Sequence, residues 1–118
     1  MKNSDKIKFD SLRAELKHLL SERIVIMDGA MGSMIQTKKL TEEDFRGELF
    51  PNHNVELRGC NDLLCLTQPN IIADIHRDYL SAGADIIETN TFNSTCFSMA
   101  DYGLENSVTE INHAASAL

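Results

Sequence analysis

The sequence predicts an α/β fold with parallel strands, and three features of the chain support this prediction. Four consecutive apolar residues, 24–27, run directly into Asp28 and a glycine, as a buried parallel strand does where it ends. A second, mostly apolar segment, 84–87, opens in the same way into polar residues. An amphipathic helix is predicted between them, and the order strand, helix, strand implies parallel strands joined by right-handed crossovers.

The N-terminal residues 1–22 are interpreted as a helical extension. Apolar residues recur there at helical spacing, which predicts an amphipathic helix over 10–21 with one buried stripe. The residues of this stripe are Phe9, Leu12, Leu16, Leu19 and Leu20. The first strand is expected over about residues 23–27, and a short helix over 30–37 follows it through Gly29.

The segment 38–66 is long and polar, and it shows no strong periodicity, although the stretch TEED at 41–44 could start a helical turn. A connection of this length inside a compact domain is unusual unless it is functional. We therefore expect a loop that lies over the strand ends and acts as a lid.

The next helix begins at Pro69, which suits a first helical turn, and Gly83 stands just past its end. Its apolar face is formed by Ile71, Ile72, Ile75 and Tyr79. The second strand, about 85–89, follows at once. A last apolar stripe over 108–118 has no capping glycine or proline, and both strands need cover on both faces. We therefore expect the chain to be a fragment of a larger sheet.

Composition limits the possible functions. The 118 residues carry a formal net charge of −7 without a basic run, which argues against a nucleic-acid or anionic-membrane surface. There is no secretory signal and no apolar stretch of membrane-spanning length, so we expect a soluble cytoplasmic protein. The odd number of irregularly spaced cysteines indicates reduced thiols rather than a disulfide framework.

Two groups of polar residues at the strand ends are candidates for a small-molecule site. Asp28 either offers its carboxylate to a ligand ammonium group or only caps the next helix, and its position alone leaves both readings open. The run 88–91 alternates, so that Thr89 shares a side with Thr91 and Glu88 shares a side with Asn90. Polar residues clustered at a strand end favour a site. For the phenylalanine at position 92 core packing is the favoured interpretation.

The sequence does not predict a metal centre or a catalytic pair. Cys60, Cys65 and Cys96 lack the spacing of a compact zinc site, and the four histidines are scattered.

The chain resembles the homocysteine-binding module of cobalamin-dependent methionine synthases over roughly residues 12–118. The stretches that carry the resemblance are MDGAMGSMIQ at 27–36, DFRGE at 44–48, NDLL at 61–64, GADIIETNTFNST at 83–95 and MADY at 99–102. The resemblance implies a (β/α)8 TIM barrel of about 250 residues. This chain would supply its first two β/α units after the N-terminal helix, so that 23–118 would be a partial homocysteine-binding domain.

The resemblance also implies a chemistry. In the family a zinc ion held by three cysteine thiolates binds the homocysteine sulfur, and the thiolate takes a methyl group from methylcobalamin, which methyltetrahydrofolate recharges on other modules. Asp28 would meet the substrate ammonium, Gly29 and Thr89 would hold its carboxylate, and Asn90 is a weaker candidate. No position matches the zinc thiolates. We therefore expect no catalytic residue in this chain and no zinc or cobalamin bound by it alone.

The leading hypothesis is the N-terminal part of a methionine synthase, with homocysteine as substrate and the rest of the barrel as partner, inactive on its own. The alternative is a self-associating interaction module without catalytic activity, since an open parallel edge invites association. Another barrel enzyme with the same Ala-Gly-Ala-Asp turn is a remote third possibility.

Overall fold

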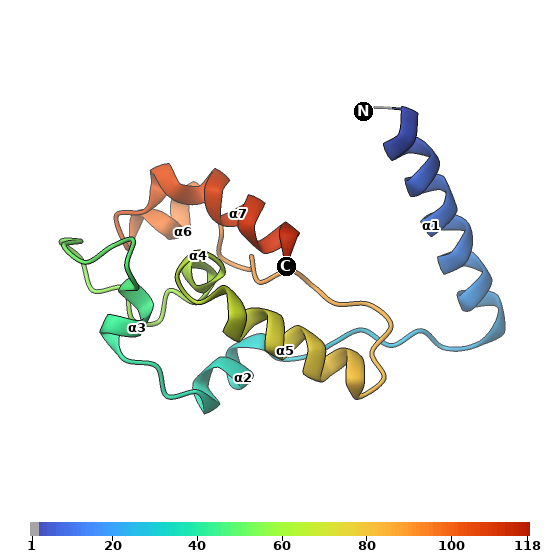
Figure 1. The fold of residues 1–118 in the computed structure, drawn as a ribbon, viewed down its shortest axis with the longest axis horizontal. Helices are drawn as coiled ribbons and strands as arrows, with labels where there is room; N and C mark the ends of the chain where they lie inside the picture. Colours follow the sequence, from blue (N-terminus) through green and yellow to red (C-terminus); the bar gives the residue numbers. More distant parts are fainter. Residues whose placement is uncertain (1–2) are drawn as a thin grey trace.

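Helices make up nearly all the regular structure of this chain. The computed structural model describes residues 3–118, and 59% of the chain is helical. The helical segments are α1 (Asn3–Glu22), α2 (Met31–Thr37), α3 (Glu42–Arg46), η1 (Asn61–Leu63), α4 (Leu64–Thr67), α5 (Pro69–Ser81), α6 (Cys96–Ala100), η2 (Glu105–Ser107) and α7 (Val108–Ala117). Figure 1 shows α2–α7 gathered into one body, with α1 standing apart from it. None of the described helices is long and apolar enough to cross a membrane.

The predicted α/β fold, with the first two β/α units of a (β/α)8 barrel, is wrong for this structure. The described residues contain no sheet, and a single parallel bridge joins Met27 to Ile86. Asp28 donates its backbone N–H to Ile86 at 2.9 Å, and Asp85 donates to the carbonyl of Ile26 at 2.8 Å. The two segments, 24–28 and 85–89, therefore run side by side without forming strands. We call them the first and the second bridged segment.

The physical reason is a lack of cover. Parallel strands are stable when both faces are buried, and a pair of strands alone is marginal in water. Here the side chain of Ile24 is 85% exposed and that of Ile26 is 55% exposed. The apolar run that predicted a buried strand lies at the surface.

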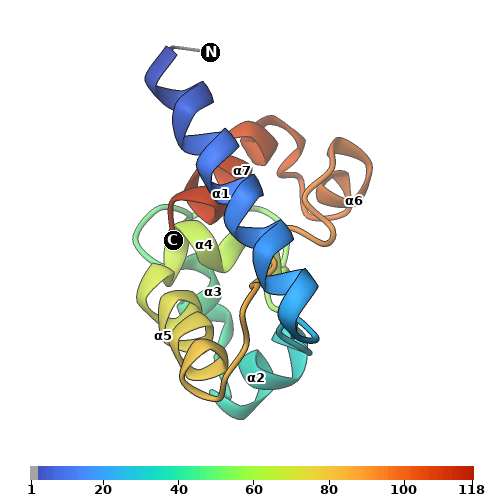
Figure 2. The same cartoon turned by 90° about the vertical axis from the view of Figure 1, so that its right-hand side faces the viewer.

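The N-terminal helix forms, but its apolar stripe is not buried. α1 begins seven residues earlier than predicted, and residues 1 and 2 of the predicted extension lie outside the described residues. Phe9, Leu12 and Leu20 are 58%, 55% and 59% exposed. The stripe is exposed because α1 stands away from the other helices, as Figures 1 and 2 show together.

The predicted lid over 38–66 is instead part of the core. Leu57, Leu63 and Leu64 are completely buried, α3 and η1 lie within this segment, and α4 begins in it. A capping box begins α3, in which Thr41 accepts the backbone N–H of Asp44 and returns its own to the Asp44 carboxylate. Periodicity missed these elements because each is only three to five residues long.

The glutamate that begins α3 holds the following loop. The Glu42 carboxylate accepts the backbone N–H groups of Leu57 and Arg58 at 2.9 and 2.6 Å, and it pairs with the Arg46 guanidinium at 2.7 Å. Desolvation alone would raise the pKa of Glu42, but these hydrogen bonds and the Arg46 charge outweigh it and lower the pKa. The charged carboxylate therefore closes the loop onto α3.

The predicted helix after Pro69 is confirmed as α5. Ile72 and Ile75 on its predicted apolar face are fully buried, and α5 packs against α2 and α4. In the C-terminal helix α7, Ile111 and Ala115 are buried and pack in the same core, with α7 against α4. This helical core positions the ends of the bridged segments.

Candidate functional site

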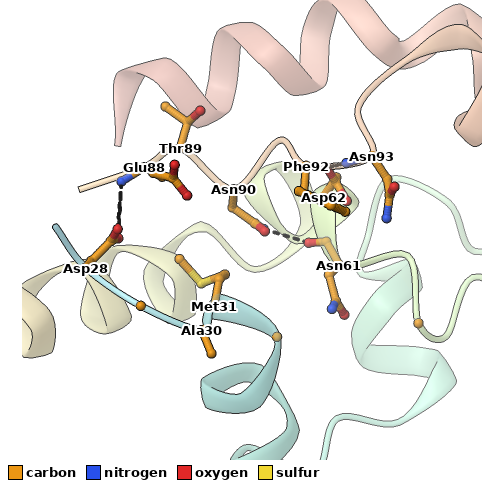
Figure 3. Close-up of a pocket in the computed structure, with 13 residues that line it drawn as sticks. Asp28, Ala30, Met31, Asn61, Asp62, Glu88, Thr89, Asn90, Phe92 and Asn93 are labelled. Atoms are coloured by element: carbon orange, nitrogen blue, oxygen red, sulfur yellow. Dashed lines mark hydrogen bonds between the residues drawn. The ribbon is translucent and has the colours of Figure 1, made fainter. Parts of the chain in front are cut away.

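A pocket of about 380 Å³ opens where the first bridged segment enters α2, beside η1 and the segment that follows the second bridged segment. Figure 3 shows its walls. It is lined by Asp28, Gly29, Ala30, Met31, Gly32, Gly59, Asn61, Asp62, Glu88, Thr89, Asn90, Phe92 and Asn93. All four residues that the sequence predicted for a substrate site line this one pocket. Their role as ligands is a separate question, taken up as a proposal below.

Asp28 is held by the backbone of the opposite segment. Its two carboxylate oxygens accept the N–H of Glu88 at 3.1 and 3.2 Å (Figure 3). The alternative that Asp28 caps the next helix is wrong, because Ala30 is the N-cap residue of α2 and no side chain caps that helix. The carboxylate is free to face the pocket.

Gly29 brings the backbone close to an aromatic ring of α5. A Cβ atom at this position would lie 3.5 Å from the hydroxyl of Tyr79, which is ordinary van der Waals contact. The same hydroxyl donates to the carbonyl of Ala30 at 3.3 Å. These contacts fix the turn that forms one wall of the pocket.

Thr89 lines the second wall of the pocket and lies on the same side of the chain as Thr91, as their alternation predicted. The hydroxyl oxygens of Thr89 and Thr91 are 2.8 Å apart, which is a hydrogen bond in either direction. Glu88 is exposed and lines the same pocket. Phe92 is 96% exposed at the pocket rim, so the predicted core packing of this ring is wrong.

Asn90 points into the protein rather than toward solvent. It is buried, and its side-chain amide donates to the carbonyl of Asn61 at 2.8 Å. The backbone carbonyl oxygen of Asn90 lies 3.6 Å from the sulfur of Cys65. Figure 3 shows the first of these contacts crossing the pocket floor.

Sequence reasoning did not single out Asp62, although it lies within a stretch that carries the resemblance. Asp62 is 4% exposed and accepts the backbone N–H of Asn93 at 2.9 Å. Burial raises the pKa of Asp62, and the backbone N–H groups around it partly oppose this. The only signal in the sequence is an acid placed directly before two leucines, where a charge is unexpected.

The side chains that line the pocket include three carboxylates and no lysine, arginine or histidine. Such a lining favours a ligand with a cationic group, because carboxylates attract ammonium at short range. The neighbouring threonine hydroxyls add neutral donors and acceptors. The arrangement can therefore orient a small polar molecule that carries an ammonium group.

The cysteines do not fit a zinc site. Cys60 contacts the sulfur of Met99 at 3.7 Å, whereas Cys96 is exposed near the carbonyl of Glu105. Burial raises the pKa of both Cys60 and Cys65 to about 11, so both are neutral thiols at neutral pH. Among the side chains that the structure describes, those of residues 6–118, no three from cysteines, histidines or acids are placed to share a metal ion.

The comparison with known protein families gives the class of this protein. A sequence model of the homocysteine S-methyltransferase family matches residues 25–118, which is most of the chain. The chain belongs to this family, whose chemistry is methyl transfer to the sulfur of homocysteine. The match begins after α1, so the N-terminal helix lies outside it.

Proposed function

We propose that this chain binds homocysteine in the pocket and forms part of the substrate site of a cobalamin-dependent methionine synthase. The observation that carries the proposal is that Asp28, Gly29 and Thr89 all line one pocket in a member of this family. Homocysteine carries an ammonium group, a carboxylate and a thiol. The pocket offers partners for the first two.

Asp28 is the partner that we assign to the ammonium group. An ionised carboxylate has about four lone-pair positions, and the N–H of Glu88 occupies only part of this capacity. The same N–H holds the carboxylate in place before the ligand arrives. Binding then costs little side-chain entropy.

Thr89 and the turn at Gly29 are assigned to the substrate carboxylate. The hydroxyls of Thr89 and Thr91 share one hydrogen bond, and when Thr91 is its donor the proton of Thr89 is left to donate to the substrate. Asn90 is less suited to this task, because its amide nitrogen already donates to Asn61. We assign Asn90 to the wall of the pocket instead.

Activation of the sulfur is assigned to groups outside this chain. Cys60 contacts the sulfur of Met99 and Cys65 contacts the backbone carbonyl of Asn90, and among the described side chains no group of three metal ligands includes either thiol. We propose that the chain alone binds homocysteine without methylating it. Methylcobalamin and methyltetrahydrofolate would be handled by other modules, as the resemblance implies.

Calorimetry with L-homocysteine on the full 118-residue chain tests the proposal. Asp28→Asn keeps an oxygen for the Glu88 N–H but removes the charge, and we expect its Kd to rise at least about tenfold. The control is Asp78→Asn, an equal charge change on the exposed side of α5, which should leave Kd unchanged.

A second ligand separates recognition of the ammonium group from general binding. 4-Mercaptobutanoate lacks the ammonium group, so it should bind the native chain weakly and should not distinguish native from Asp28→Asn. Equal affinity for both ligands would contradict the assignment of Asp28. Zinc near one equivalent in the same sample, with turnover of methylcobalamin, would contradict the claim that the chain does not methylate.

The alternative of a self-associating module is supported by one observation, the exposed apolar stripe of α1. Contiguous exposed apolar surface often marks an interaction site. This function does not use the pocket, so the two candidates can be tested separately.

A further inference from the structure

The segment 89–94 forms one wall of the pocket without belonging to a helix or a sheet. Its internal backbone hydrogen bonds are those of turns, from Thr91 to Thr89 at 2.8 Å and from Ser94 to Thr91 at 3.1 Å. Such bonds shape a loop but do not fix its place against the rest of the molecule. Contacts with another element must do that.

Two hydrogen bonds connect this segment to η1. Asn90 donates its side-chain amide to the carbonyl of Asn61 at 2.8 Å, and Asn93 donates its backbone N–H to the carboxylate of Asp62 at 2.9 Å. We call these four residues the pocket anchor. Both bonds lie at the pocket and join positions about 30 residues apart in the chain (Figure 3).

Asp62 is the unusual member of the pocket anchor. Its side chain is almost fully buried, and its recorded contacts are with backbone N–H groups rather than with a lysine, arginine or histidine. Burying a carboxylate without a cation is costly, and an apolar residue would serve the core better. The cost is offset only in part by a charge-assisted bond, which is stronger than a neutral one.

We infer that Asp62 is a positioning residue for substrate binding: its carboxylate holds the backbone at Asn93 and thereby sets the Thr89 wall against Asp28. The inference rests on the proposed homocysteine site and names a residue outside the predicted ligands. Asp62 itself need not touch the substrate. Its effect reaches the pocket through the backbone of the segment 89–94.

The test compares two substitutions at one position in the full chain. Asp62→Asn keeps a carbonyl oxygen that can accept the Asn93 N–H, whereas the side chain of Asp62→Ser is too short to reach it. We expect amide exchange at Asn93, followed by NMR, to be at least about tenfold faster in Asp62→Ser and within about threefold of native in Asp62→Asn. The Kd for L-homocysteine should likewise rise more in Asp62→Ser than in Asp62→Asn.

The backbone amide of Ile75 in the buried face of α5 reports global unfolding. Faster exchange at Asn93 with unchanged exchange at Ile75 is the expected result, since a positioning role is local. Equal effects of the two substitutions on Kd would overturn the inference, because rescue by the retained oxygen is its central claim. Unchanged exchange at Asn93 in Asp62→Ser would overturn it as well.

A measurement on the native chain tests the inference even if a variant does not fold. Homocysteine should slow exchange at Asn93 relative to Ile75, and a ligand-bound chain without this effect would contradict the inference. If the native chain does not bind homocysteine at all, the proposed function fails. The exchange comparison between Asp62→Asn and Asp62→Ser would then still decide whether the pocket anchor exists.

Discussion

At the scale of single residues, Arg23 and Asp85 form a two-pronged ion pair beside the only bridge in the described chain. The guanidinium donates to the two carboxylate oxygens at 2.7 and 2.6 Å, and the N–H of Ile26 donates to the same carboxylate at 3.0 Å. The hydrogen bond from Arg23, followed by that from Ile26, lowers the pKa of Asp85 to about 2. The pair therefore holds residues 24–28 against 85–89.

This ion pair predicts a pH dependence of stability. The pKa of Asp85 lies at about 2 in the folded chain, below its ordinary value of 3.8, so the unfolded chain binds more protons between these values. The stabilisation is present above about pH 4 and is lost as the pH falls towards about 2. Near neutral pH the Tm of Asp85→Asn should be lower than that of the native chain. This difference in Tm should disappear as the pH falls towards about 2.

Circular dichroism melting curves across this pH range make the measurement. Asp78→Asn removes an exposed acid from α5 and serves as the control. A difference in Tm between native and Asp85→Asn that stays constant down to pH about 2 would contradict the prediction.

Single residues of the pocket were partly predictable from the sequence. Asp28 and Thr89 were found because polar residues directly after apolar runs converge wherever two such runs lie side by side, and a single bridge is enough for that. Asp62 was missed because its contact is with a backbone N–H 31 residues away, which leaves no pattern in the local sequence. The exposure of Phe92 was missed because an aromatic ring is assigned to the core by default.

At the scale of elements, the turn that ends α5 depends on a glycine. Gly83 has a φ of +107°, a conformation that residues with a Cβ rarely adopt, and no atom lies within 4 Å of the place where a Cβ would stand. Any cost of a side chain here is therefore backbone strain and not a clash. This turn leads directly into the second bridged segment.

We predict that Gly83→Ala lowers the free energy of unfolding by about 1–3 kcal/mol, the usual cost of such strain. Gly29→Ala is the matched comparison, since its φ is not positive and its new Cβ would meet Tyr79 at ordinary contact distance. It should cost less than about 1 kcal/mol. Urea unfolding of both variants measures the two values, and equal costs would refute the argument from φ.

Elements that bury a wide face were predictable, and those that depend on distant partners were not. α5 and α7 show apolar residues at helical spacing, and the central residues of those faces, Ile72, Ile75 and Ile111, are fully buried. The prediction of two strands was wrong because an apolar run is buried only when other elements cover it. Within the segment 38–66 only the start of α3 at Thr41 was indicated by the sequence. η1 and α4 were not predicted, because one turn of helix is too short to show a period.

At the scale of the whole molecule, apolar surface is concentrated at the end that carries α1 and the first bridged segment. Phe9, Leu12, Leu16 and Leu20 follow one another at spacings of three and four residues on α1, and each is at least 38% exposed. Ile24 and Ile26 continue this surface along the chain. A helix with such a stripe is stabilised mainly by packing against another surface.

We predict that the isolated chain self-associates through this stripe, with a weight-average mass that rises with concentration in sedimentation equilibrium. The double substitution Leu12→Lys and Leu16→Lys places two charges on the stripe and should shift the chain toward the monomer. Leu49→Lys, at an equally exposed leucine outside α1, should not. A native chain that stays monomeric at all concentrations would contradict the prediction. Because the pocket lies outside α1, the double variant should keep its affinity for homocysteine, and loss of both properties together would mean that association builds the pocket.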